Sequence, residues 1–288
     1  MGAALLDGKS LSLSIEEDLK TRIEDLKKVN IFPHLAVILV GTDQASQIYV
    51  KNKERACERI GIKSTKIILP SSTSQNEVLE IIRKMNEDDS IHGILVQSPT
   101  PEGINELAIT EEISPSKDVD GFHPYNLGKL VQGETGGLVP CTPAGIMKIL
   151  DNANINLEGK RATVIGRSRI VGMPVALMLA RKGIDASVTI MHSKSEDIAQ
   201  ICRESDIIIA AIGKPEVIKA DWIKPNSIVV DVGISRVMDN NSGKYKLVGD
   251  VESEAMEVAS HMTPVPGGVG PMTIAMLLTN TVVAAVKK

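Results

Sequence analysis

One stretch of the sequence, residues 160–182, constrains the fold more than any other. A short run rich in β-branched residues, 162–165, is interrupted by Gly166, and apolar residues then recur at helical spacing. The pattern predicts a strand, a tight turn and a helix, because Gly166 permits the sharp exit and Pro174 suits a first helical turn. The start of such a helix directs free backbone N–H groups and a positive dipole end at the turn, which predicts an anion-binding site.

The turn departs from the complete dinucleotide-binding fingerprint. Ser168 and Ile170 stand where that fingerprint has glycines, so an ordinary strand–helix turn remains the alternative. Two features favour a nucleotide. Arg167 and Arg169 place two cations in the turn, and a further strand at 187–191 follows at the distance that a βαβ unit requires.

The end of that following strand distinguishes the two nicotinamide cofactors. An NAD site usually has an Asp or Glu there, which binds the ribose hydroxyls. In this chain Met191 is followed by His192, Ser193 and Lys194, without an acid. A hydroxyl and a cation favour a 2′-phosphate, so the sequence predicts NADP rather than NAD.

Composition excludes several kinds of partner and site. With 288 residues, 43% of them hydrophobic, the chain is expected to be a soluble globular protein of two domains. A net charge of −4 gives no reason to expect nucleic acid or an anionic membrane as a partner. The cysteines form no CxxC pair, and His92 and His123 show no ligand spacing, so we expect no metal site. We see no signal peptide, and polar residues interrupt the longest apolar stretch, 274–286, which predicts a cytoplasmic protein.

Both halves of the chain alternate strands with helices, which predicts an α/β fold. The first half is expected to contain strands at 35–40, 65–69 and 91–96 and helices at 14–29, 46–60 and 75–86. The second is expected to contain strands at 162–165, 187–191, 206–211 and 227–232 with intervening helices, as in a Rossmann-like domain. Between them we expect a loop at 118–136 and a helix that Thr142 caps, ending at Leu150.

The C-terminal segment completes the predicted domains. The residues from Pro264 to Pro271 are expected to form an irregular loop, and a final helix is expected to begin at Pro271. We therefore predict a catalytic α/β domain of residues 1–143 plus 271–288, so that the C-terminal helix returns to it. Residues 144–270 are predicted to form the Rossmann-like NADP-binding domain.

Four polar residues near expected strand ends are candidates for chemistry. Tyr49 and Lys53 lie one helical turn apart; such a pair is often only a solvated surface pair, but a partly desolvated lysine can transfer protons near neutral pH. Gln97 can hydrogen-bond this lysine or simply end a strand. Asp120 can form a turn or pair with the N–H groups of a heterocycle.

Six motifs occur in an order that is specific. They are Tyr49-Val50-Lys51-Asn52-Lys53, Val96-Gln97-Ser98-Pro99-Thr100-Pro101, Lys117-Asp118-Val119-Asp120-Gly121-Phe122-His123, Pro140-Cys141-Thr142-Pro143, Gly166-Arg167-Ser168 with Val171-Gly172, and Pro264 to Thr273. Together they resemble the bifunctional methylenetetrahydrofolate dehydrogenase/cyclohydrolase family over nearly the whole chain. Ser98 and Thr100 replace two leucines of that family, while Gln97 is retained.

The resemblance implies an enzyme of one-carbon metabolism that binds tetrahydrofolate derivatives. It implies NADP-dependent oxidation of 5,10-methylenetetrahydrofolate to 5,10-methenyltetrahydrofolate, followed by hydrolysis to 10-formyltetrahydrofolate. It also implies a homodimer whose subunits each hold folate in a cleft between two domains, with Lys53 as the catalytic lysine and Tyr49 stacked on the folate. Gln97 would orient Lys53, and Asp120 would anchor the pterin.

The remaining implied contacts fall in the second half of the chain. The loop containing Pro264, Gly267 and Gly268 would close over the folate. The residues implied to hold NADP are Gly166, Arg167, Ser168, Ser193 and Ile234.

Three other functions stay open on the sequence. Another two-domain NADP-dependent dehydrogenase would need a cation for its substrate carboxylate and would leave the loop 264–273 without a purpose. A non-catalytic, dinucleotide-binding redox sensor would show no turnover. The third, a monofunctional dehydrogenase, would have no need of the intact set of Tyr49, Lys53 and Gln97.

Overall fold

The computed structural model describes residues 2–134, 136–238 and 243–287. Its internal contacts divide the chain into two compact units, and each is described by itself. The three-stranded unit comprises Leu13–Cys141 and Ile274–Lys288. The six-stranded unit comprises Met1–Ser12 and Thr142–Thr273. The predicted α/β class with parallel sheets is confirmed.

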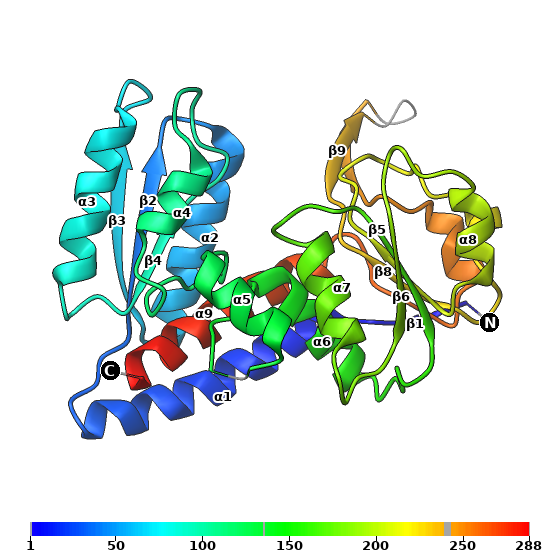
Figure 1. Cartoon of the computed structure of the whole chain (residues 1–288), viewed down its shortest axis with the longest axis horizontal. Coiled ribbons are helices and arrows are strands. Elements are labelled where there is room, and N and C mark those ends of the chain that lie inside the picture. Colours follow the sequence, from blue (N-terminus) through cyan, green and yellow to red (C-terminus); the bar gives the residue numbers. More distant parts are fainter. Residues whose placement is uncertain (1, 135, 239–242, 288) are drawn as a thin grey trace. The chain divides into compact units, whose positions relative to one another are not determined.

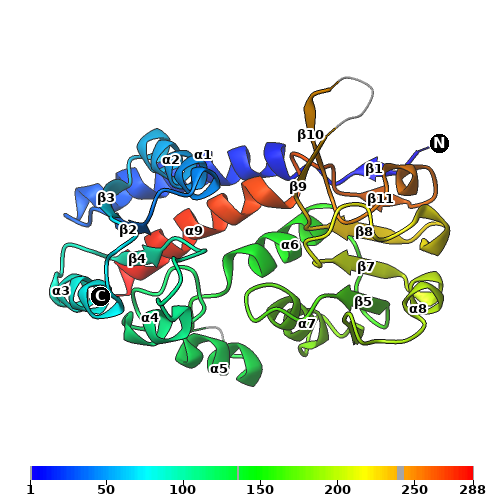
Figure 2. The ribbon, with the colours of Figure 1, turned by 90° about the horizontal axis from the view of Figure 1, so that it is seen from above.

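The three-stranded unit is built on a parallel sheet in the order β3-β2-β4. Its strands are β2 (His34–Val40), β3 (Lys63–Leu69) and β4 (Gly93–Val96), and its helices include α2 (Gln44–Ile60), α3 (Gln75–Glu87), α4 (Glu106–Glu112) and α5 (Pro124–Gln132). Figures 1 and 2 show α2 on one face of this sheet and α3 and α4 on the other. All seven residues of β2 are buried, which explains why residues 35–40 form a continuous apolar run after His34.

Local signals set the helix starts of this unit. Asp43 caps α2 by accepting the N–H of Ser46, and Ser74 and Glu77 form a reciprocal capping box at α3. The predicted order strand, helix, strand, helix, strand is confirmed, with ends displaced by only a few residues.

The prediction of a loop at 118–136 is wrong, because α5 lies within it. His123 caps this helix: its Nδ1 accepts the N–H of Tyr125 at 3.0 Å, and Pro124 occupies the first turn. Gly133 ends the helix in the left-handed conformation. Turn-forming residues here mark the two ends of a short helix rather than a continuous loop.

The six-stranded unit contains a parallel sheet in the order β1-β11-β8-β7-β5-β6. The strands are β1 (Ala4–Leu5), β5 (Arg161–Ile165), β6 (Ser187–Met191), β7 (Ile207–Ala210), β8 (Ile228–Asp231) and β11 (His261–Met262). The helices include α7 (Gly172–Ala180), α8 (Ile198–Glu204) and the 3-10 turns η1 (Ala220–Trp222) and η2 (Ser253–Glu257). A separate antiparallel pair is formed by β9 (Ser235–Met238) and β10 (Tyr245–Val248). Between β7 and β8, all of whose residues the structure describes, only η1 occurs, so the α-helix expected in that connection is absent.

The first residues of the chain cluster with the six-stranded unit, whereas our predicted bounds place them in the other domain. The reason is the pairing of β1 with β11, in which Ala4 lies opposite His261. Residues 274–288 cluster with the three-stranded unit, in line with a returning C-terminal helix. The exact bounds of the functional domains stay a prediction.

Three helices contain the boundaries between the two units: α1 (Gly8–Lys28), α6 (Cys141–Asn152) and α9 (Val269–Val286). Because α6 begins at Cys141, Thr142 lies inside the helix and does not cap it; its hydroxyl hydrogen-bonds the Thr273 hydroxyl at 2.9 Å. Helix α9 begins two residues before the predicted Pro271. It is long and apolar enough to cross a membrane, but 56% of it is buried inside the protein, as expected of a core helix.

Candidate functional site

The side chains of Lys53 and Gln97 meet at the carboxyl edge of the three-stranded sheet. Lys53 Nζ, from α2, donates a hydrogen bond to Gln97 Oε1 at 3.0 Å. Gln97 follows β4 directly, and its backbone N–H continues the ladder to Ile38 O at 2.8 Å. Gln97 Nε2 donates to Ser98 O at 2.6 Å, which turns Oε1 toward the lysine. The glutamine therefore fixes the position of the amine from a rigid strand end.

Tyr49 lies one turn before Lys53 on the same helix. Its side chain is 43% exposed. An exposed aromatic ring beside a held amine offers a flat surface on which a planar ligand can stack.

Asp120 joins this group through the segment that precedes it. Lys117 O accepts the N–H of Ile94 at 2.8 Å, and Asp118 forms a parallel bridge with Ile94. The chain turns directly after this bridge, where the Gly121 N–H donates to Asp118 O at 3.0 Å, and Asp120 lies in that turn. Burial raises the pKa of Asp120 to about 6, the nearby Lys53 ammonium opposes the rise, and the Asp118 charge adds to it.

The two carboxylates of this loop have different functions. Asp118 accepts hydrogen bonds from the N–H groups of Phe122 and His123, at 3.2 and 2.8 Å, and from Asn126 Nδ2 at 2.8 Å. It therefore shapes the turn. For Asp120, the residues that the structure describes provide no hydrogen bond to the carboxylate, so its oxygens are available to a ligand.

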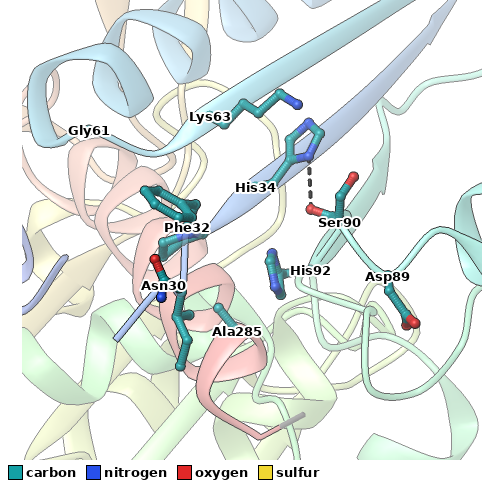
Figure 3. A pocket seen from close by; sticks show the side chains of 11 residues that line it. Asn30, Phe32, His34, Gly61, Lys63, Asp89, Ser90, His92 and Ala285 are labelled. Carbon is teal, nitrogen blue, oxygen red and sulfur yellow. Dashed lines mark hydrogen bonds between the residues drawn. The ribbon is translucent and has the colours of Figure 1, made fainter. Parts of the chain in front are cut away.

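A hollow of about 600 Å³ lies at the opposite, amino edge of the same sheet (Figure 3). His34 and Lys63, at the starts of β2 and β3, line it together with the half-exposed ring of Phe32. The His34 ring is held by Ser90 O at 2.9 Å and by the Thr65 hydroxyl at 2.8 Å. These bonds give His34 a structural role, and burial lowers its pKa.

The six-stranded unit contains the predicted phosphate turn after β5. Gly166 has φ +131°, and a Cβ there would overlap the backbone of Ala211, so only glycine fits. The side chains of Arg167 and Ser168 are exposed. Ser168 Oγ accepts the N–H groups of Val171 and Gly172 at 3.1 and 3.4 Å. Gly172 is the first residue of α7, and the N–H of the next residue, Met173, donates to Ser168 O at 3.0 Å. The prediction of free N–H groups at the start of this helix is therefore wrong, because Ser168 accepts both of them.

The other predicted cofactor and loop residues also lie in this unit. Ser193 is exposed just after β6, and Ile234 is 49% exposed just after β8, so both lie at the same carboxyl edge as Gly166. Pro264, Gly267 and Gly268 precede α9. Gly267 has φ +110°, and its carbonyl accepts the N–H of Lys9 at 2.8 Å.

Sequence reasoning missed two buried carboxylates at this edge. Asp250 is fully buried and accepts the successive N–H groups of residues 212–214 at 2.6 to 3.0 Å. Asp231 accepts the N–H groups of Gly233, Asp250 and Val251, and burial raises its pKa to about 6. The two carboxylates shape the loops after β7 and β8. In the sequence, only the nearby glycines hint at these carboxylates. A Cβ at Gly233 would overlap Asp250, and a Cβ at Gly249 would overlap Asp231.

Two family models together match most of the chain. Residues 6–120 match the family model of the tetrahydrofolate dehydrogenase/cyclohydrolase catalytic domain, and residues 140–288 match the model of its NAD(P)-binding domain. The chain belongs to the tetrahydrofolate dehydrogenase/cyclohydrolase family. The resemblance inferred from the six motifs is thereby confirmed.

Individual members of the tetrahydrofolate dehydrogenase/cyclohydrolase family are similar over their whole length. The bifunctional protein FolD of Acetivibrio thermocellus is 53% identical over 287 residues, which cover 99% of this chain and 98% of that protein. The crystal structure of the bifunctional enzyme FolD, a methylenetetrahydrofolate dehydrogenase/cyclohydrolase from Campylobacter jejuni, has 51% identity, covers 99% of both chains and has a TM-score of 0.94. The Trypanosoma brucei enzyme, complexed with NADP cofactor and inhibitor, has 37% identity and a TM-score of 0.94, covering 100% of this chain and 98% of that one.

Proposed function

We propose that this protein oxidises 5,10-methylenetetrahydrofolate with NADP and hydrolyses the product, 5,10-methenyltetrahydrofolate, to 10-formyltetrahydrofolate. The observation that carries the proposal is the Lys53 amine, held 3.0 Å from Gln97 Oε1, with the partly buried Asp120 carboxylate close enough to interact with its charge. The relatives named bifunctional FolD, about half identical over the whole chain, support both activities.

The oxidation depends mainly on positioning. The methylene carbon lies between two nitrogens and gives up a hydride, which leaves a cation that both nitrogens stabilise; NADP supplies the hydride acceptor. Tyr49 offers the ring on which the folate stacks. The Asp120 carboxylate accepts hydrogen bonds from the N–H groups of the pterin.

The hydrolysis needs proton transfer, for which Lys53 is placed. Water adds to the methenyl carbon and loses a proton, which leaves a hydroxyl group on that carbon. One carbon–nitrogen bond then breaks: its nitrogen gains a proton, and the hydroxyl loses its own proton to solvent as it becomes the formyl C=O. The Lys53 amine accepts the proton from the attacking water and returns it to the nitrogen, while Gln97 Oε1 keeps the amine in place. The pKa of Asp120, raised to about 6, leaves this neighbouring carboxylate able to change its charge near neutral pH.

The turn after β5 fits an NADP phosphate group. The glycine-only backbone at Gly166 permits close approach, and Arg167 supplies an exposed cation. Ser193 follows β6 where an NAD site usually has a carboxylate. Arg167 and Ser193 are therefore proposed to bind the 2′-phosphate, and Ile234 to cover the cofactor with its exposed side chain.

Turnover tests the proposal directly. The purified protein is incubated with 5,10-methylenetetrahydrofolate and NADP, and NADPH is followed by absorbance while 10-formyltetrahydrofolate is measured by chromatography. Both products are expected. NADPH without the formyl product would support a monofunctional dehydrogenase, and no turnover at all would contradict the proposal and favour a binding protein.

The homodimer also belongs to the proposal. The β9–β10 hairpin exposes the large side chains of Met238, Tyr245 and Leu247, at 50, 56 and 43%, and a second copy of the chain would bury them. Sedimentation of the parent should give a dimer, and Leu247→Lys should give a monomer. A parent that sediments as a monomer would exclude this surface as a dimer contact. The cytoplasmic location stays a prediction.

A further inference from the structure

One amide on the C-terminal helix connects three separate segments of the three-stranded unit. Asn280 Nδ2, from α9, donates to Val119 O at 2.8 Å and to Val139 O at 2.9 Å, and it lies 3.6 Å from Cys141 Sγ. An amide nitrogen carries two protons, so the two carbonyls use both of its donors. The Cys141 thiol also donates to Val119 O, at 3.2 Å.

The Val119 carbonyl belongs to the peptide bond that leads into Asp120, so a bond to it fixes the plane of that peptide. The residue on the other side is equally constrained. Gly121 has φ +76°, and a Cβ there would overlap the backbone of Val139 and Pro140. The Asp120 backbone is therefore held from both sides against the 139–141 segment.

The Asp120 carboxylate depends on this backbone for its position. Asp118, two residues earlier, is fixed by its own hydrogen bonds, whereas Asp120 faces the Lys53 ammonium without such bonds among the described residues. Its side chain has only two rotatable bonds, so a shift of the peptide moves the carboxylate by a similar distance. A misplacement of about 1 Å at a reacting site can cost about a hundredfold in rate.

We infer that Asn280 is a positioning residue: its amide holds the Val119–Asp120 peptide so that the Asp120 carboxylate meets the folate beside Lys53. The inference rests on the proposed function. It gives the C-terminal helix a part in substrate binding, through Asn280, which lies 161 positions along the chain from Val119.

The test uses two variants of Asn280 and one matched control. Asn280→Ala removes the amide, and Asn280→Gln keeps the donor on a longer side chain. Thr281→Val removes a fully buried polar group from the same helix, whose hydroxyl donates only within the helix, to Leu277 O at 2.9 Å. The full-length proteins are compared by steady-state kinetics, by fluorescence titration with NADP, and by hydrogen exchange of the peptides that cover residues 117–123.

Asn280→Ala should raise the KM for 5,10-methylenetetrahydrofolate about tenfold or more. It should leave the NADP dissociation constant within about twofold and speed exchange at 117–123. Asn280→Gln should show the same pattern to a smaller extent, which keeps the test usable if the alanine variant folds poorly. Thr281→Val should match the parent in all three measurements.

Two results would overturn the inference. One is an exchange rate at 117–123 that does not change in either Asn280 variant. The other is faster exchange with an unchanged folate KM, or with an equal loss of NADP affinity, since either would reduce Asn280 to a general structural role. A parent that does not turn over folate refutes the proposed function instead; hydrogen exchange would then still decide whether Asn280 holds the loop.

Discussion

Asp120→Asn should make the protein more stable at neutral pH while it weakens the folate site. The pKa of Asp120 is about 6 in the folded protein, against 3.8 for an unperturbed aspartate. Between these two values the folded protein keeps a proton that the unfolded chain has already lost, so stability falls as the pH rises. At about 1.4 kcal/mol per pH unit, the ionised carboxylate costs up to about 3 kcal/mol at pH 7.

Asparagine cannot ionise, so the folded variant is not destabilised by a buried charge at this position. Its free energy of unfolding should exceed that of the parent by up to about 3 kcal/mol at pH 7, and the difference should shrink toward zero near pH 4. The measurement is urea unfolding of both proteins by circular dichroism between pH 4 and 8. Subtracting one stability profile from the other cancels the pH dependence that both proteins share, such as that from buried Asp231, whose pKa is also raised to about 6.

The same substitution removes a charged acceptor from the proposed pterin contact. Hydrogen bonds to charged groups contribute about 1.5–3 kcal/mol, so the folate KM should rise roughly tenfold to a hundredfold. A stability difference that is constant from pH 4 to 8, or a variant less stable than the parent at pH 8, would refute the reasoning. Either result would mean that burial does not destabilise the Asp120 carboxylate.

Three further substitutions test separate parts of the structure. Lys53→Met should abolish methenyltetrahydrofolate hydrolysis, followed by the loss of methenyl absorbance, in a protein with a parental circular dichroism spectrum; hydrolysis at the parental rate would remove Lys53 from the mechanism. Arg167→Ala should raise the KM for NADP more than that for NAD, and equal effects would argue against a 2′-phosphate contact. Lys117→Met should lower the free energy of unfolding, measured in urea, by about 3 kcal/mol. The reason is that the buried Lys117 ammonium donates to three carbonyls at the end of α3, those of Met85, Asn86 and Asp88. An unchanged unfolding midpoint would contradict that role.

All three strands of the three-stranded sheet and four of the six strands of the other sheet could be read from local patterns. Residues 35–40 of β2 are buried on both faces of the sheet and are all apolar, and an amphipathic helix such as α3 repeats its apolar residues at helical spacing. The short α5 could not be found in this way because it contains Pro124 and Gly128, which are residues typical of loops, and is defined mainly by its ends, His123 and Gly133. Two-residue β1 carries no local signal either, since its partner β11 lies at the other end of the sequence.

The site was partly predictable for a similar reason. Tyr49 and Lys53 share a helix face, so their spacing alone places them together. No local pattern distinguishes Asp118 from Asp120. Asp118 is a turn former because Asn126 and two loop amides satisfy it, and Asp120 remains available to a ligand because nothing comparable reaches it within the described residues.

The sequence by itself determined the family, the alternation of strands and helices, and the residue types at the lysine site and the phosphate turn. Those properties depend on neighbours in the chain, which periodicity and motifs record. The tertiary structure decided which polar groups are satisfied: Asp250 accepts the N–H groups of residues 212–214, and Asn280 holds the peptide before Asp120 across 161 positions. Whether a partly buried donor or acceptor finds a partner depends on segments that meet only when the chain folds.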